Sequence, residues 1–196
     1  EDAICHATSY DGIHFTPNLA NPIFAPTGTW TCGRAIDADV IDHKGSLFLY
    51  FSTRDPAMRI QMTGVATAPL DSDFSAEVWQ QRGDGPILKP TLPWEQDCIE
   101  ASALCKHQGR LFMFYGGAYN NRPQQIGCAV SDDGIAWTRI SDRPILPNGG
   151  PGTWNSSESG HPFAFQASDG RDHLFFQGNN DDGVTWYLSR KEIVWR

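Results

Sequence analysis

Residues 36–53 of this 196-residue chain read IDADVIDHKGSLFLYFST. Two short apolar runs flank the turn residues Lys44-Gly45, which is the pattern of a β-hairpin. The same pattern returns after about 60 residues around Gln108-Gly109, and again around Asp169-Gly170. A repeat of this length built from short strands is typical of propeller blades, which stack around a common axis.

Each copy of the repeat also carries a Pro-Ile-hydrophobic triplet, a tryptophan, and a polar residue near the start of an apolar run. The copies are Pro22-Ile23-Phe24 with Trp30 and Asp37, Pro86-Ile87-Leu88 with Trp94 and Glu100, and Pro144-Ile145-Leu146 with Trp154 and His161. Equivalent positions of successive blades converge on the propeller axis. The sequence therefore predicts that Asp37, Glu100 and His161 come together, which favours a carboxylate-based active site over a plain scaffold.

The strands expected from β-propensity are short and lie between turn residues. Inner strands are expected at 39–41, 101–104 and 162–165, second strands at 46–53, 110–115 and 173–177, and third strands at 3–9, 60–67 and 126–131. The motif Asp-Gly-Ile-x-aromatic-Thr at 11–16 and 133–138 predicts hairpins into outer strands, which a longer turn replaces at 70–79. The chain end is expected to hold strands at 183–188 and 193–196, and no helix of three turns is expected.

This pattern predicts one all-β domain over residues 1–196, a propeller of the five-bladed type. Counting the runs gives about three and a half to four blades, with only the outer half of a first blade at residues 1–17. Exposed strand edges must be paired or covered. We therefore expect a missing N-terminal segment or a second subunit to complete the propeller.

Charge and cysteine content limit the partners and the compartment. The chain has 15 basic and 23 acidic residues and a net charge of −8, which argues against nucleic acid and anionic membrane and fits a neutral ligand such as a sugar. No apolar run approaches a membrane span. The five cysteines are odd in number and form no Cys-x-x-Cys pair, so we expect free thiols. This favours a cytoplasmic location, while secretion remains an alternative.

The residues that could do chemistry are carboxylates and a histidine. Glu100 lies among small and apolar residues, where desolvation would raise its pKa as a general acid requires; the alternative is an exposed loop glutamate. Asp37 and Asp39 share one face of a strand, and one of them could face Glu100; alternatively, they cap a turn and pair with Arg34. His161 could hold an ion or a substrate hydroxyl, although a lone histidine is more often structural.

Three segments resemble the five-bladed propeller glycoside hydrolases, most closely family 43, the arabinanase, arabinofuranosidase and β-xylosidase group. Residues 35–41, AIDADVI, resemble the segment whose Asp tunes and orients the acid; residues 99–104, IEASAL, resemble the segment that carries the general acid; residues 159–165, SGHPFAF, resemble the segment with the central His. The resemblance implies that Glu100 is the general acid and that Asp37 is its modulator, which tunes the pKa of the acid and orients it. It also implies that His161 lies at the propeller centre, where the family's histidine often helps to hold an ion such as calcium. No cofactor is required.

The chain departs from the family pattern at several points. Ala38 stands where the family has Pro, Ser102 replaces the Pro after Glu-Ala, and Asp39 could be the modulator in place of Asp37. The family's general base would precede Glu1. Arg54-Asp55-Pro56 resembles a motif of the sucrose- and fructan-cleaving propellers, but it follows its strand here instead of preceding it. The candidates for substrate contact are Trp30, Asp39, Arg54, Glu158 and His161.

The function expected from this resemblance is hydrolysis of arabinose- or xylose-containing plant-type oligosaccharides with inversion. An inverting enzyme needs an acid and a base roughly 6.5–9.5 Å apart, with a water between the base and the sugar. One alternative is a non-catalytic propeller that binds glycan or protein. Another is a related hydrolase or phosphorylase acting on fructosides or mannosides, since the fold does not fix the reaction.

Overall fold

The computed structural model describes residues 2–195, and nearly all of their regular structure is β-strand. The strands form four antiparallel sheets, here called sheets I to IV, each running in chain order from its first strand to its last. Sheet I holds β1 (Ala7–Thr8) and β2 (Thr16–Pro17); sheet II holds β3 (Ile36–His43), β4 (Ser46–Arg54), β5 (Gln61–Pro69) and β6 (Gln80–Gln81); sheet III holds β7 (Ile99–His107), β8 (Arg110–Gly117), β9 (Gln125–Ser131) and β10 (Thr138–Arg139); sheet IV holds β11 (Glu158–Gln166), β12 (Asp172–Asn179) and β13 (Tyr187–Ile193).

The expected all-β class is confirmed, and the helices in the described range are two short 3-10 turns, η1 (Ala76–Val78) and η2 (Pro93–Glu95). The predicted inner and second strands of sheets II, III and IV are present and extend a few residues further than expected. Both Asp-Gly motifs form the predicted hairpins, because β1 pairs with β2 and β9 with β10. The total of five blades stays a prediction.

Two expectations about strands were wrong. Only Ala7–Thr8 of the run 3–9 is a strand, and the two strands expected at 183–188 and 193–196 are one strand, β13. The reason at 183–188 is a turn in which the Asp181 side chain accepts hydrogen bonds from the backbone amides of Val184 (3.1 Å) and Thr185 (3.0 Å). Such a side-chain turn delays the strand to Tyr187. The last predicted residue, Arg196, lies outside the described residues.

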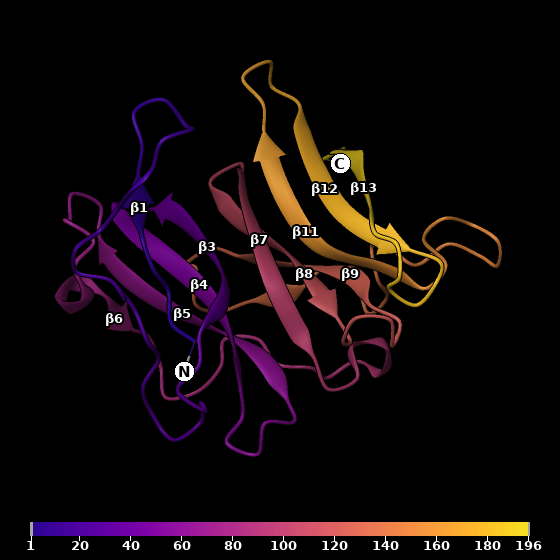
Figure 1. Cartoon of the computed structure of the whole chain (residues 1–196), viewed down its shortest axis with the longest axis horizontal. Helices are drawn as coiled ribbons and strands as arrows, with labels where there is room; N and C mark the ends of the chain where they lie inside the picture. Colours follow the sequence, from indigo (N-terminus) through magenta and orange to yellow (C-terminus); the bar gives the residue numbers. More distant parts are fainter. Residues whose placement is uncertain (1, 196) are drawn as a thin grey trace.

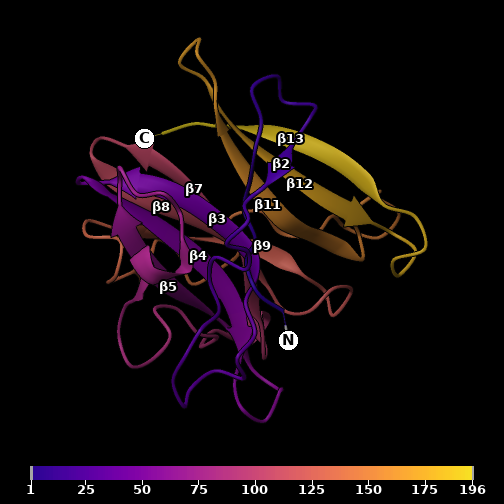
Figure 2. The ribbon, with the colours of Figure 1, turned by 60° about the vertical axis from the view of Figure 1, so that its left-hand side comes forward.

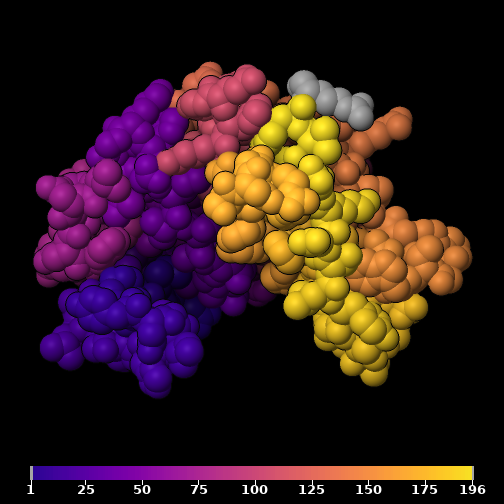
Figure 3. All heavy atoms as spheres, turned by 90° about the horizontal axis from the view of Figure 1, so that it is seen from above, coloured from indigo at the N-terminus to yellow at the C-terminus, as the bar shows by residue number. Residues whose placement is uncertain are grey.

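Sheets II, III and IV lie side by side with their inner strands β3, β7 and β11 adjacent (Figures 1 and 2). β7 is the middle one and contacts both β3 and β11. Seen from above, the N-terminal segment and the C-terminal sheet stand on either side of a hollow (Figure 3). Side chains at the starts of the three inner strands are therefore brought together.

Tryptophans pack on glycines inside the sheets. A Cβ added to Gly64 would lie 2.4 Å from Phe51 and 2.9 Å from Trp30, and one added to Gly127 would lie 2.8 Å from Trp94. Trp30 also stacks on Phe51, with ring centroids 6.5 Å apart. Trp30, expected to contact substrate, thus packs against the core of sheet II.

The seam between sheets II and III is closed by the second Asp-Gly hairpin. The Trp137 ring meets Tyr50 edge to face at 5.7 Å. The Tyr50 hydroxyl donates a 2.9 Å hydrogen bond to the carbonyl oxygen of Gly134. Aromatic packing and a buried hydrogen bond therefore hold the two sheets together.

All five cysteines are free thiols; Cys98, Cys105 and Cys128 are buried, Cys32 is half-buried and Cys5 is exposed. Between residues 2 and 195, no helix has the length and apolar character needed to cross a membrane.

Candidate active site

A β-bulge interrupts each inner strand at the same point. The pairing register shifts between Ile36 and Asp39 in β3, between Glu100 and Ala103 in β7, and between Gly160 and Phe163 in β11. One residue in each bulge has a positive φ: Asp37 (50°), Ala101 (52°) and His161 (44°). Bulges of this kind redirect side chains and are common beside active sites.

The bulges show that the three predicted residues are not strictly equivalent. Asp37 and His161 occupy the same bulge position, whereas Glu100 lies one residue earlier and Ala101 takes the position with positive φ. The sequence carried this difference, because Glu100 follows its tryptophan by six residues and the other two follow theirs by seven. The bulge nevertheless brings Glu100 and His161 together: His161 Nε2 lies 3.9 Å from Glu100 Oε1.

Two glutamines hold the carboxyl group of Glu100, which is 7% exposed. Gln61 Nε2, from the start of β5, donates to Oε2. Gln124 Nε2, from just before β9, donates to Oε1 at 2.6 Å and also to the carbonyl oxygen of Ala118 at 3.0 Å. Each carboxyl oxygen therefore has its own amide donor.

The orientation of both amides follows from their other partners. Arg54 Nε donates to Gln61 Oε1 at 2.9 Å, and the backbone amide of His161 donates to Gln124 Oε1 at 3.2 Å. Arginine and a backbone N–H have no acceptor lone pair, so each must meet an amide oxygen. The NH2 groups of both glutamines must then face Glu100.

The two glutamines occupy one position of the repeat. Gly64 pairs with Phe51 in sheet II as Gly127 pairs with Tyr115 in sheet III, and each glutamine lies three residues before its glycine. Gly160 makes room for Gln124, since a Cβ there would lie 1.8 Å from Gln124 Oε1. Sequence reasoning missed Gln61 and Gln124, although aligning the repeats on Gly64 and Gly127 would have found them.

His161 is fixed by a second glutamine network. Gln177 Nε2 lies 2.7 Å from His161 Nδ1 and donates to the buried Glu158 Oε1 at 3.0 Å. Because the amide nitrogen donates, Nδ1 accepts, and the proton of the neutral ring lies on Nε2. That Nε2–H is directed toward the Glu100 side of the site. Glu158 also accepts from the backbone amide of Asn121 at 2.8 Å, so it supports His161 from the interior.

Burial raises the pKa of Glu100, an effect that His161 in its cationic form and the hydrogen bond from Gln124 partly offset and that the charge of Asp37 increases. Desolvation also raises the pKa of Asp37, although this residue is exposed to solvent, and the charges of cationic His161 and of Arg34 oppose that rise. Burial raises the pKa of Glu158 against the hydrogen bond from Gln177. A carboxyl group whose pKa is raised in this way retains its proton closer to neutral pH.

Asp39, a predicted site residue, and Asp55, a neighbour of the predicted Arg54, both lie in structural roles. Asp39 Oδ2 accepts from the backbone amide of Leu104 at 2.7 Å, so it ties β3 to β7. Burial raises the pKa of Asp39, and its two backbone hydrogen bonds oppose that rise. Asp55 of the Arg-Asp-Pro triplet accepts from the amides of Arg59 and Ile60 and closes an exposed loop. Arg54 of the same triplet reaches Gln61, and its guanidinium lies 5.2 Å from the Tyr119 ring centroid.

A metal at His161 finds little support in the residues around it. Across residues 2–195, no group of three or more His, Cys, Asp or Glu side chains is arranged to hold an ion. Nδ1 of His161 is already engaged by Gln177. Calcium prefers six to eight oxygen ligands, so an ion beside His161 would need backbone, amide or water oxygens as most of its ligands.

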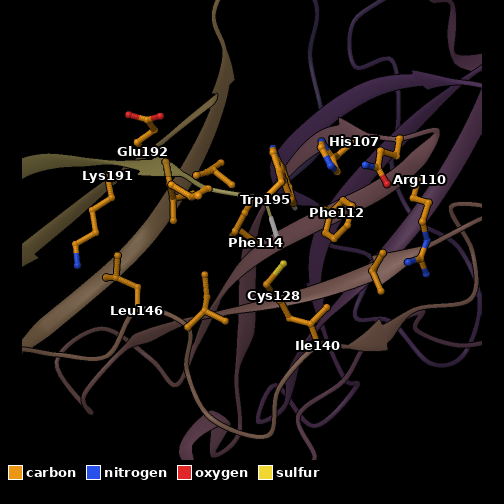
Figure 4. A pocket seen from close by; sticks show the side chains of 16 residues that line it. His107, Arg110, Phe112, Phe114, Cys128, Ile140, Leu146, Lys191, Glu192 and Trp195 are labelled. Carbon is orange, nitrogen blue, oxygen red and sulfur yellow. The ribbon is translucent and has the colours of Figure 1, made fainter. Parts of the chain in front are cut away.

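A cavity of about 720 Å³ lies away from this site, between sheets III and IV (Figure 4). Phe112, Phe114, Cys128, Leu146 and Trp195 line much of it, and none of its lining residues is a carboxylate of the candidate site. Its walls continue the core cluster of these two sheets. The chemistry at Glu100 is therefore separate from this space.

No known family profile matches the sequence, and no curated protein matches it. Solved structures do match. A thermostable family-43 glycoside hydrolase has a TM-score of 0.75 at 22% identity, over 99% of this chain and 64% of that one. An α-L-arabinofuranosidase from Lactobacillus brevis has a TM-score of 0.69 at 18% identity, over 93% and 57%. A β-1,2-mannobiose phosphorylase from Listeria innocua has a TM-score of 0.70 at 18% identity, over 96% and 48%.

The chain spans about half to two thirds of the length of these structures. Identities this low show a shared fold and leave the reaction open. The resemblance to family 43 and related propeller hydrolases is thus confirmed at the level of the fold.

Proposed function

We propose that the protein is a glycoside hydrolase whose general acid is Glu100, acting on arabinose- or xylose-containing oligosaccharides with inversion. The observation that carries this proposal is the environment of Glu100. The carboxyl group is buried at a strand bulge, its pKa is raised, and its neighbours Asp37 and His161 come from the two flanking inner strands. A buried carboxyl group with a raised pKa, beside a second carboxylate and a histidine, matches the needs of a proton donor at neutral pH.

In this proposal Glu100 protonates the leaving oxygen as the glycosidic bond breaks, so that the leaving sugar departs as a neutral alcohol. A water molecule forms the new bond to the anomeric carbon from the opposite face and gives its proton to a general base. Asp37 keeps the proton on Glu100 through its negative charge, because like charges disfavour ionisation of both groups. His161 offers its Nε2–H to a substrate hydroxyl or to Glu100 itself.

The phosphorylase among the similar structures supplies a second candidate reaction on this scaffold. A phosphorylase breaks the same kind of bond but transfers the sugar to phosphate, so its turnover requires inorganic phosphate. A binding module would retain sugar without cleaving it. Turnover measured with and without phosphate separates the three functions.

The experiment is to compare Glu100→Gln with the wild type on two substrates of each sugar, an unactivated oligosaccharide and a 4-nitrophenyl glycoside. Only the poor leaving group of the oligosaccharide needs the proton. We expect kcat/KM on the oligosaccharide to fall by roughly 10²–10⁴-fold and that on the aryl glycoside by far less.

Glu77→Gln is the matched control, since Glu77 is an exposed glutamate of η1. It should leave both rates unchanged. Equal losses on the two substrates in Glu100→Gln, or no loss, would remove Glu100 from the acid role.

A further inference from the structure

We propose that Arg54 is a positioning residue that acts on Glu100 through Gln61, by preventing the Gln61 carboxamide from turning over. The inference rests on the proposed role of Glu100 as the acid. It assigns a function to a side chain that does not touch Glu100 in the structure.

Two consecutive hydrogen bonds connect Arg54 to Glu100 through Gln61, and we call this arrangement the relay. Arg54 Nε donates to Gln61 Oε1, and Gln61 Nε2 donates to Glu100 Oε2. Gln61 is 1% exposed, so water has little access to either end of its amide. Arg54 and Gln61 are also directly paired in the β4–β5 ladder, and the guanidinium lies against Tyr119.

A carboxamide has two ends of similar size and opposite hydrogen-bonding character. With Arg54 present, a turned amide would set its NH2 against the Arg54 Nε–H and its oxygen against the Glu100 carboxylate. Both contacts would be repulsive in a site with little water. The carboxylate by itself disfavours the turned orientation while Glu100 is ionised, and Arg54 excludes that orientation for protonated Glu100 as well.

The second glutamine does not depend on Arg54. Gln124 is oriented by the backbone amide of His161 and by the carbonyl oxygen of Ala118. Gln61, the donor to Oε2 of Glu100, is therefore the one of the two glutamines whose orientation depends on a side chain, which a substitution can remove. This makes the relay separable by mutation.

Several titratable groups face Glu100 from the surrounding elements. They are Asp37 of β3, Arg54 of β4, Cys98 before β7, Tyr119 after β8, and Glu158 and His161 of β11. Removing Arg54 also deletes a positive charge, which by itself would favour the protonated acid. The test must separate this charge effect from the turning of the amide.

The test is a double-mutant cycle on the pKa of Glu100, read by carbon-13 NMR of the labelled glutamate carboxyl, with Glu100→Gln to assign the resonance. Arg54→Met should raise that pKa by about one pH unit, because the Gln61 amide can then turn its oxygen toward the proton of Glu100 and stabilise the protonated acid. Gln61→Met should raise it by a similar amount. Adding Arg54→Met to Gln61→Met should then raise it by clearly less than Arg54→Met does alone, because only the loss of the Arg54 charge remains.

The cycle has clear opposing outcomes. If Arg54 acts only by its charge, Arg54→Met will raise the pKa equally with and without Gln61, and the relay is refuted. An unchanged pKa in Arg54→Met refutes it too. Arg110→Met controls for charge, since it removes an exposed arginine paired with Asp132 at the far end of β8, and it should leave Glu100 unaffected. Should Arg54→Met not fold, Arg54→Gln takes its place, because a glutamine can donate or accept and therefore no longer fixes the Gln61 amide.

The NMR readout is independent of catalysis. A chain that shows the expected cycle but no turnover refutes the proposed function and leaves the relay intact. A hydrolase whose Glu100 shows no cycle refutes the relay alone. In an active chain, the alkaline limb of kcat/KM should move to higher pH in step with the measured pKa.

Discussion

Gly64 offers a test of how tightly sheet II is packed around Trp30. Gly64→Ala places a Cβ 2.4 Å from Phe51 Cζ, 2.8 Å from Phe51 Cε2 and 2.9 Å from Trp30 Cη2. Real Cβ atoms do not approach rings this closely, and Phe51 is fully buried, so a ring or the strand must move.

The magnitude follows from two opposing contributions. Overpacking in a filled core costs about 1–3 kcal/mol, and the double contact here places Gly64→Ala near the upper end. The loss of chain freedom in the unfolded state returns about 0.4–1 kcal/mol. The net expectation is a loss of about 2 kcal/mol, which lowers Tm by roughly 4–8 °C in a chain of this size.

Urea unfolding followed by tryptophan fluorescence, together with calorimetry, measures both quantities. Gly85→Ala is the matched control, because no atom lies within 4 Å of the added Cβ and its backbone has an ordinary φ. It should unfold like the wild type or slightly later. If Gly64→Ala matches Gly85→Ala, the packing of Trp30 against sheet II is looser than described, and a substrate-facing Trp30 would regain support.

Three further outcomes test the site itself. Asp37→Asn should reduce kcat/KM by more than Asp39→Asn does. Asp39→Asn should instead reduce the unfolding free energy by about 1 kcal/mol, because it weakens a hydrogen bond to the β7 backbone. The reverse ranking of the two rates would make Asp39 the modulator. Because the acid must be protonated, kcat/KM should fall as pH rises through the raised pKa of Glu100. Asp37→Asn should move this alkaline limb to lower pH, because it removes a charge that raises this pKa. The pH dependence of kcat/KM in the wild type and in Asp37→Asn checks the direction. Gly160→Ala should push the Gln124 amide off Glu100 and lower kcat by roughly 10–100-fold, the cost of one hydrogen bond to a charged group; full activity in a folded Gly160→Ala chain would contradict it.

The positions of Asp37, Glu100 and His161 could be predicted from the sequence because each follows a tryptophan at a nearly constant interval. The one-residue difference at Glu100 could not be interpreted in advance. A bulge allows neighbouring residues of one strand to oppose a single partner residue, so residues six and seven positions after a tryptophan can both reach the site. Only the pairing register distinguishes them.

Other roles depended on contacts between sheets, which periodicity does not encode. Asp39 has the spacing of a second site carboxylate, yet a backbone amide in the next sheet engages it. Gln61 and Gln124 carry no charge and match no catalytic motif, so only their shared spacing of three residues before Gly64 and Gly127 marks them. Their significance comes from meeting on Glu100, a residue 39 positions from one and 24 from the other.

The two hydrogen bonds to the Glu100 carboxyl group come from opposite sides of the seam between sheets II and III. Gln61 of sheet II donates to one oxygen, and Gln124 of sheet III donates to the other. Sliding of the two sheets by a fraction of an ångström would lengthen one of these bonds while sparing the other. The measured pKa of Glu100 should therefore report on how closely sheets II and III pack against each other. Changes that loosen the seam far from the carboxylate, for instance at Trp137 or Tyr50, should appear in that titration before any loss of secondary structure.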